Sequence, residues 1–220
     1  MTDSLLHQLA GLIERTYDIT PGIEDYASYV IGDDGYRRRW MAHLEEVEPH
    51  SARMLVREQG RDLHAAIYYP NELICELEQA PPQHGLNEAN VDAFATFVEE
   101  LDHLLLLAWR RLQSRPVSQF EMELQANVTK YLVLQRFLST NGRLDESRRR
   151  WLHHHLFEKA EFSDENVKIR RRYEQASRSA VQLIRGLPMV ATSRIRLLRR
   201  FYAANSGGKL ELISTLASRN

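Results

Sequence analysis

The second half of the chain carries its apolar residues at three- and four-residue steps, the spacing of one face of an α-helix. The clearest example spans about residues 88–112, where the apolar face consists of Val91, Phe94, Ala95, Val98, Leu101, Leu105, Ala108 and Leu112. Leu104, Leu106 and Leu107 fill the other faces of the same segment. Because a helix that is apolar all round is buried, we predict that this is the central helix of the fold.

Start and stop signals divide the following residues into further helices. Arg115-Pro116 ends the central helix, and Ser118 with Glu121 has the spacing of a capping box that starts the next one. Asn141-Gly142, Gly186 and Ser206-Gly207-Gly208 separate the later helices from one another. The helices predicted after the central one span about residues 118–140, 145–159, 163–185, 193–204 and 210–218.

The first 80 residues mix helical and extended patterns. Helices are expected at about residues 4–17, 36–46 and 71–79. Residues 51–70 instead contain two short apolar, β-branched and aromatic runs around a turn at Gly60, which is typical of a β-hairpin. Because an isolated hairpin is marginal in water, it needs a further partner, and residues 26–31 are the candidate third strand.

These patterns predict a mainly α fold with a small β-hairpin element, of the α+β class, built as a multi-helix bundle around the buried helix at about residues 88–112. The segment at residues 81–85, Pro-Pro-Gln-His-Gly, is the strongest linker signal in the chain. It separates an N-terminal helix and β-hairpin subdomain at residues 1–80 from a helical bundle domain at residues 86–220. We expect the two parts to form one compact unit.

Composition excludes several classes of protein. Apolar residues make up 43% of the 220 positions, which excludes a disordered or low-complexity chain. The single cysteine, Cys75, has no partner in the chain, which favours a reducing compartment, and we expect it to be a small core residue. The N-terminus does not resemble a signal peptide, and the longest apolar run, at residues 104–109, is far shorter than the roughly 20 residues that cross a bilayer. These features predict a cytoplasmic protein with no membrane partner.

The formal net charge of -1 hides a strong asymmetry along the chain. Residues 1–140 carry 12 basic and 22 acidic side chains, whereas residues 141–220 carry 17 basic and 8 acidic ones. The two parts therefore have net charges of -10 and +9. Because such fields steer association, our first hypothesis is a non-enzymatic binding or adaptor protein that engages a partner protein or a second copy of itself.

Arginine supplies most of the positive charge in the last 80 residues. The candidate anion- or partner-binding residues are Arg148, Arg149, Arg150, Arg170, Arg171, Arg172, Arg196, Arg199 and Arg200. Aromatic residues accompany them, a composition typical of a phosphate-binding face with stacking partners, so nucleic-acid binding is a further alternative. The chain has no helix-turn-helix, zinc-finger, RRM or KH signature, and the same arginine runs are typical of a solvated helix face.

A Glu-x-x-His pattern on the central helix is the main candidate for chemistry. Glu99 and Glu100 each lie about one turn from His103, so a carboxylate and an imidazole project from one face. Di-iron bundles use this spacing on two helices, and the sequence holds no second copy, so it does not favour a di-iron site. The ordinary alternative is a hydrogen-bonded histidine at the edge of a buried helix.

Polar residues on the following helix are the candidate partners of this group. Glu123 and Asn127 lie one turn apart on a face next to the apolar stripe. If they point towards the central helix, the polar pocket between the two long helices consists of Glu99, Glu100, His103, Glu123 and Asn127. Our second hypothesis is therefore a helical enzyme or a protein that binds a small ligand or a metal in this pocket. The alternative is the normal polar surface of an amphipathic helix.

Motifs of established chemistry are not present in the sequence. It contains no Gly-rich phosphate loop, Gly-x-Ser-x-Gly elbow, His-Glu-x-x-His or Cys-x-x-Cys pattern. The sequence alone therefore assigns no catalytic residue, no metal ligand and no cofactor, and it favours a non-enzymatic role. We rank the three hypotheses in the order adaptor, polar pocket and nucleic-acid binding.

Overall fold

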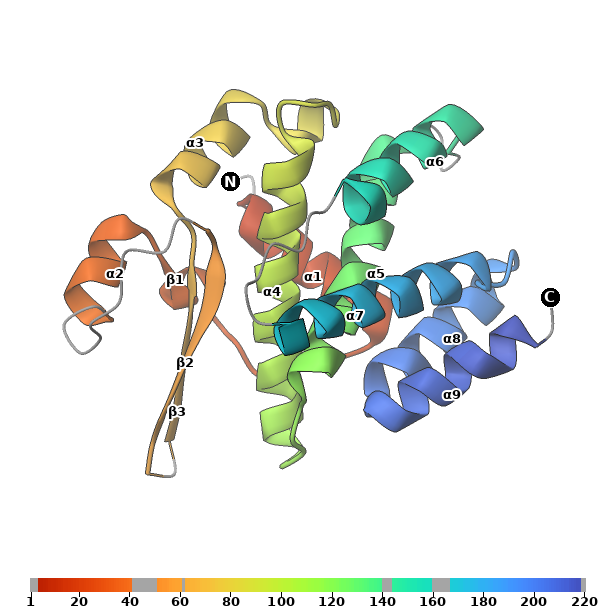
Figure 1. Cartoon of the computed structure of the whole chain (residues 1–220). Helices are drawn as coiled ribbons and strands as arrows, with labels where there is room; N and C mark the ends of the chain where they lie inside the picture. The colour runs from red at the N-terminus through yellow and green to blue at the C-terminus, as the bar shows by residue number, and fades with distance from the viewer. Residues whose placement is uncertain (1–3, 41–50, 61, 140–143, 160–166, 219–220) are drawn as a thin grey trace.

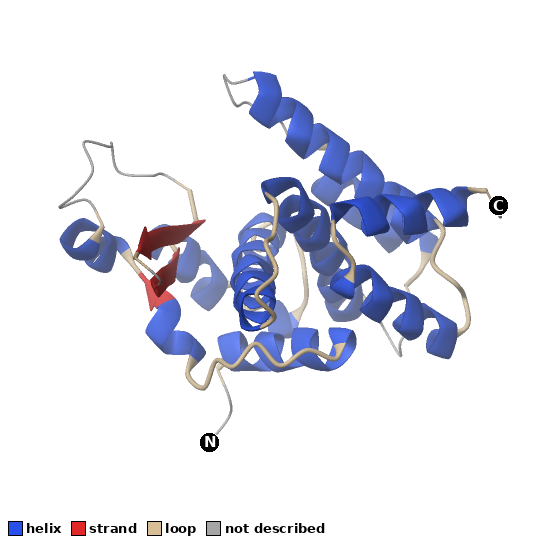
Figure 2. Ribbon diagram, turned by 90° about the horizontal axis from the view of Figure 1, so that it is seen from below, coloured by secondary structure: helices blue, strands red, loops and turns tan. Residues whose placement is uncertain are grey.

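The structure is a computed structural model that describes residues 4–40, 51–60, 62–139, 144–159 and 167–218. These residues form a mainly helical molecule with a small sheet at one side (Figure 1, Figure 2). The α-helices are α1 (Leu5–Tyr17), α2 (Asp33–Arg39), α3 (Asn71–Gln79), α4 (Val91–Leu112), α5 (Gln119–Leu138), α6 (Glu146–His153), α7 (Val167–Arg185), α8 (Ala191–Ala203) and α9 (Ser206–Ala217). The strands are β1 (Val30–Ile31), β2 (Arg53–Gln59) and β3 (Asp62–Tyr68).

Helix α4 is the buried centre of the molecule, as the apolar pattern predicts. It contacts α1, α3 and α5 and also strands β2 and β3. Leu101 and Leu105 have no exposed surface, and Leu104 on another face is 1% exposed. Ser118 begins α5 because its hydroxyl accepts a hydrogen bond from the backbone N–H of Glu121, at 3.1 Å. The predicted bundle of helices around a buried central helix is confirmed.

The predicted hairpin is confirmed, and it forms a three-stranded sheet in the order β1-β3-β2. Strands β2 and β3 are antiparallel, with Leu55 opposite Ala66, and Gly60 at the turn has a positive φ of 65° that suits glycine. The third strand is shorter than predicted. Only Val30 and Ile31 pair with β3, in parallel, while Tyr26–Tyr29 form a 3-10 turn.

Several predicted boundaries need correction. Helix α9 begins at Ser206 and therefore includes the two glycines that were expected to precede it, because the Asn205 side chain accepts a hydrogen bond from the N–H of Gly208. Helix α2 begins at Asp33, three residues before its predicted start. Cys75 is exposed on α3 and not a core residue, since α3 buries Leu77 on its other face. The predicted turn at 140–143 and the predicted start at 163–164 lie outside the described residues.

The segment predicted as a linker is held against α4 by one side chain. Asn90, at the N-terminal end of α4, donates from its amide to the backbone oxygens of Ala80 and Gly85, both at 2.9 Å. Pro82–His84 between them form a 3-10 turn. The N-terminal part also has a satellite apolar cluster beside the main core, made of Ile31, Tyr36, Leu55, Ala66 and Tyr68.

The helix of α6 does not end at His153. It continues as a π-helical turn at His154–Glu158, which the helical period did not predict. In a π-helical turn, residues five apart share a face, and the ring nitrogens of His153 and His154 lie 3.1 and 3.2 Å from the carboxylate of Glu158. No described helix combines the length and the apolar character that crossing a bilayer requires.

Candidate functional site

The polar group predicted from the sequence lies at the interface of α4 and α5. Glu99 and His103 are one turn apart on α4, and Glu123 is on α5. The connection between the helices is short, so they run antiparallel and side by side (Figure 1). A ring nitrogen of His103 and a carboxylate oxygen of each glutamate all lie within 4.8 Å of one another. The structure thus brings together three of the five predicted pocket residues as possible metal ligands.

The surrounding helices exclude most water from this group. His103 is 6% exposed and Glu123 is 8% exposed, because the face of α5 that carries Glu123 lies against α4. The side chain of Glu99 is 23% exposed, so it forms the outer edge of the group.

Glu100 sets the orientation of the His103 ring. An oxygen of Glu100 lies 3.4 Å from Nδ1 of His103. The other ring nitrogen, Nε2, is buried and has no hydrogen-bond partner among the described residues. A histidine whose Nδ1 faces a carboxylate and whose Nε2 has no partner has the arrangement that metal-binding histidines use, with the carboxylate in the outer shell.

Lys130 is the counter-ion of Glu99. Its ammonium group donates to Oε2 of Glu99 at 2.7 Å, from a side chain that is only 12% exposed. Burial opposes ionisation of Glu99, but the charges of Lys130 and His103 outweigh it and lower the pKa of this carboxyl group. Glu99 is therefore an anion at neutral pH. Lys130 was not among the predicted pocket residues, although it lies one turn from Asn127 on α5.

The other two members of the group titrate near or above neutral pH. Burial and the neighbouring charge of Glu99 raise the pKa of Glu123 to about 7, although His103 acts in the opposite direction. Burial alone would lower the pKa of His103, but its hydrogen bond to Glu100 and the surrounding carboxylates raise it to about 9. Perturbed groups of this kind gather at functional sites more often than elsewhere.

Asn127, the fifth predicted residue, lies one turn from Glu123 on α5 and is 7% exposed. Helix α7 packs against α5 and covers this region. Tyr173 on α7 is near enough that the charges of Glu123 and Glu99, together with burial, raise its pKa to about 12. No local signal in the sequence identifies Tyr173, because its position beside the group depends on how α7 packs.

The predicted arginine groups lie on three different helices, α6, α7 and α8. Arg199 binds within the fold: it pairs with Asp18 at 3.1 Å and donates to the backbone oxygens of Thr16 and Arg15 at the end of α1. Arg172 is half-buried, with its guanidinium 5.6 Å from the ring centre of Tyr173. These two arginines therefore belong to the folded molecule rather than to a free surface.

Arg148 and Arg149 pair with acidic residues at the start of their own helix, the N-cap Asp145 and Glu146. Four of the remaining candidate arginines form no ion pair with a described residue: Arg150, Arg170, Arg196 and Arg200. Arg171 is exposed on α7.

A second polar network runs behind the candidate site. Asp102, fully buried on α4, accepts a hydrogen bond from Thr129 of α5 at 2.9 Å, and Thr129 also pairs with the hydroxyl of Tyr17 at 2.8 Å. Lys209 of α9 is fully buried too, and its ammonium donates to Gln125 and to the backbone oxygen of Phe201. The sequence did not single out these residues, because the burial of Asp102 and Lys209 depends on how the helices pack.

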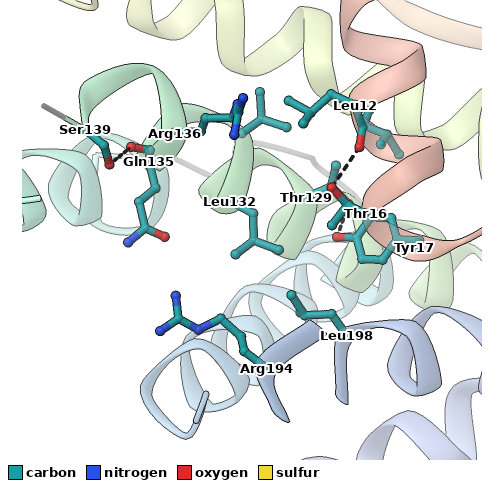
Figure 3. Close-up of a pocket in the computed structure, with 12 residues that line it drawn as sticks. Leu12, Thr16, Tyr17, Thr129, Leu132, Gln135, Arg136, Ser139, Arg194 and Leu198 are labelled. Atoms are coloured by element: carbon teal, nitrogen blue, oxygen red, sulfur yellow. Dashed lines mark hydrogen bonds between the residues drawn. The ribbon is translucent and has the colours of Figure 1, made fainter. Parts of the chain in front are cut away.

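The pocket shown in Figure 3 lies on the other side of this network, between α1, α5 and α8. Its volume is about 540 Å³, and Thr129 and Tyr17 form its inner end. It is separate from the polar group predicted between the two long helices, because none of Glu99, Glu100, His103, Glu123 and Asn127 lines it. Searches of protein-family models, curated proteins and solved structures found no match to this chain.

Proposed function

We propose that this protein binds a single divalent transition-metal ion through Glu99, His103 and Glu123. The observation that carries the proposal is the orientation of His103, whose Nδ1 faces Glu100 and whose buried Nε2 has no partner among the described residues. A buried imidazole nitrogen without a hydrogen bond is unfavourable, and a bound cation would satisfy it. Glu100 would then act on the metal through His103 as an outer-shell carboxylate.

The donor set supports a first-row divalent ion. One imidazole and two carboxylates suit Zn²⁺, Mn²⁺ or Fe²⁺, and Zn²⁺ binds these donors at about 2.0–2.2 Å. Since the three ligand atoms lie within 4.8 Å of one another, small side-chain movements bring them to those distances from a common centre. Mg²⁺ fits less well because it prefers oxygen ligands and retains several waters.

Lys130 is the group that a metal ion would replace. In the structure its ammonium neutralises Glu99, and its position at the partly exposed edge lets it turn outward when a cation arrives. The bound ion would also displace the protons held by His103 and Glu123. Metal binding therefore exchanges one cation for another and leaves the carboxylates neutralised in both states.

The test is equilibrium dialysis of the full chain against ZnCl2, MnCl2 and MgCl2, with bound metal measured by mass spectrometry. We expect one equivalent of Zn²⁺ or Mn²⁺, and a loss of at least about tenfold in affinity for Glu123→Gln and for His103→Asn. Glu100→Gln should weaken binding by a similar factor without removing a ligand. Asp92→Asn is the control, since it alters a carboxylate of α4 outside this group, one that pairs with Lys159 at 2.7 Å.

The outcomes separate a binding site from a structural cluster. If the wild-type chain retains no Zn²⁺ or Mn²⁺ and the variants only unfold at lower urea concentrations, the group is a structural polar network. If Asp92→Asn reduces metal binding as much as Glu123→Gln does, the binding site is not the one proposed.

Self-association through opposite charges is a second candidate function. It is supported by the arrangement of charges: α3 carries the exposed acidic side chains Glu72, Glu76 and Glu78, whereas α8 carries the exposed Arg196 and Arg200. Helices α3 and α8 lie at opposite ends of the molecule (Figure 1), so these charges do not neutralise each other within one chain. A second copy of the chain offers the complementary surface.

A further inference from the structure

The pocket between α1, α5 and α8 differs in chemistry from the candidate metal site. Its middle is apolar, with Leu132 of α5 and Leu198 of α8 facing each other across the space (Figure 3). Its volume of about 540 Å³ is within the range of small-molecule sites, roughly 300–1,000 Å³. The two charged side chains among the described lining residues, Arg136 and Arg194, are both cationic.

One end of the pocket is polar and positively charged. Figure 3 shows the amide of Gln135 and the guanidinium of Arg194 at this end. Arg194 is held in place because its Nε and Nη2 donate to the backbone oxygens of Pro188 and Met189, at 2.9 and 3.2 Å. Its Nη1 makes no hydrogen bond to a described residue. A guanidinium fixed in this way is preorganised to bind an anion.

The opposite end of the pocket does not demand a polar ligand. The hydroxyls of Tyr17 and Thr129 are hydrogen-bonded to each other at 2.8 Å, and the Thr129 hydroxyl also donates a hydrogen bond to Asp102. The hydroxyl of Thr16 donates to the backbone oxygen of Leu12 at 2.7 Å. Since these polar atoms are already satisfied within the protein, an apolar group can lie against them without leaving a buried donor unpaired.

We infer that this pocket binds a small amphipathic carboxylate, with its charged head at Arg194 and Gln135 and its hydrocarbon chain between Leu132 and Leu198. Arg136, which Figure 3 shows on the side of the pocket near Leu12, adds a second positive charge at the rim. The inference is independent of metal binding, because no residue of the Glu99–His103–Glu123 group lines the pocket.

The test is isothermal titration calorimetry of the full chain with decanoate, below its micelle concentration, and with decanol as the uncharged analogue. Decanoate should bind at least about tenfold more tightly than decanol, because decanol lacks the charged head. Acetate should not bind, because it lacks the hydrocarbon chain. Arg136→Gln combined with Arg194→Gln should weaken decanoate binding at least about tenfold and leave decanol binding unchanged.

The controls keep folding separate from binding. Arg196→Gln removes an exposed charge from α8 two residues from Arg194, outside the pocket, and should bind decanoate as the wild type does. Arg194 also donates hydrogen bonds to the turn before α8, so its replacement can affect folding. Arg136→Gln is therefore measured alone as well, and we expect a smaller loss of decanoate affinity than in the double variant. Equal affinities for decanoate and decanol, wild-type affinity in the double variant, or no binding at millimolar decanoate would each overturn the inference.

Discussion

Lys209 is an ionisable side chain that the fold places entirely out of water. Burial lowers its pKa to about 7, although the charge of Glu121 acts in the opposite direction. Its hydrogen bonds to Gln125 and to the Phe201 carbonyl satisfy the amine in either protonation state. At the residue scale, the protein therefore contains a lysine whose charge is destabilising at neutral pH and absent at higher pH.

This shift predicts how Lys209 contributes to stability as a function of pH. Between about pH 7 and its ordinary value of 10.5, the folded state holds fewer protons on Lys209 than the unfolded state. The free energy of unfolding should therefore rise with pH in this window relative to a Lys209→Met variant. Urea unfolding of both proteins at pH 7 and pH 9.5 measures the difference. If that difference is the same at both values, the lysine keeps an ordinary pKa.

The exposed Lys168→Met is the matched control for this measurement, because it removes the same charge from the surface. Its effect on stability should be within about 0.5 kcal/mol at both pH values.

At the scale of elements, one ion pair fastens the end of α4 to the connection between α8 and α9. Arg110 of α4 pairs with Glu121 of α5 and donates to the backbone oxygens of Ala203 and Ala204. Arg110 and Glu121 are 1% and 2% exposed, so both charges are isolated from water. The guanidinium of Arg110 therefore connects the ends of four helices, α4, α5, α8 and α9.

Removing one partner should be strongly destabilising. Arg110→Met leaves Glu121 buried without its counter-ion, and we expect a loss of about 3–5 kcal/mol in the free energy of unfolding. The exposed Arg150→Met should change it by less than about 0.5 kcal/mol. Replacing Glu121 by Met as well should recover part of the loss, since no unpaired charge then remains. A loss below about 1 kcal/mol for Arg110→Met would show that water reaches the pair.

The elements also show where prediction from local sequence succeeds and where it fails. The apolar period located α4 and α5, and the Ser118 hydroxyl caps α5 as the sequence signal indicates. The early start of α9 depends on the Asn205 cap, which outweighs the low helix propensity of two glycines. The π-helical turn at 154–158 depends on packing and leaves no periodic signal.

At the scale of the molecule, the charge asymmetry of the sequence becomes a spatial one. Only a few ion pairs connect the acidic and basic parts of the described chain, among them Arg199 with Asp18 and Lys159 with Asp92. Helix α3, with its exposed acidic residues, and helix α8, with its exposed arginines, lie at opposite ends of the molecule (Figure 1).

Self-association should therefore depend on salt. Light scattering after size exclusion should show a mass above the 25.7 kDa monomer at low ionic strength and the monomer in high salt. Arg196→Glu with Arg200→Glu should remain monomeric in low salt, and Arg150→Glu on α6 is the control. A wild-type chain that is monomeric at every salt concentration would refute the proposal. Salt-sensitive retention of DNA by that monomer would support nucleic-acid binding instead.

By itself, the sequence determined the helical class of the protein, its central helix, the hairpin and the helical spacing of Glu99 with His103, because these depend on residues close together in the chain. Tertiary structure alone decided the rest. It placed Glu123 and Lys130 against α4, brought Tyr173 over them, and buried Lys209. It also opened a pocket between α1, α5 and α8. These features depend on which helix faces pack together, and the residues adjacent in sequence do not determine which helix covers a given side chain.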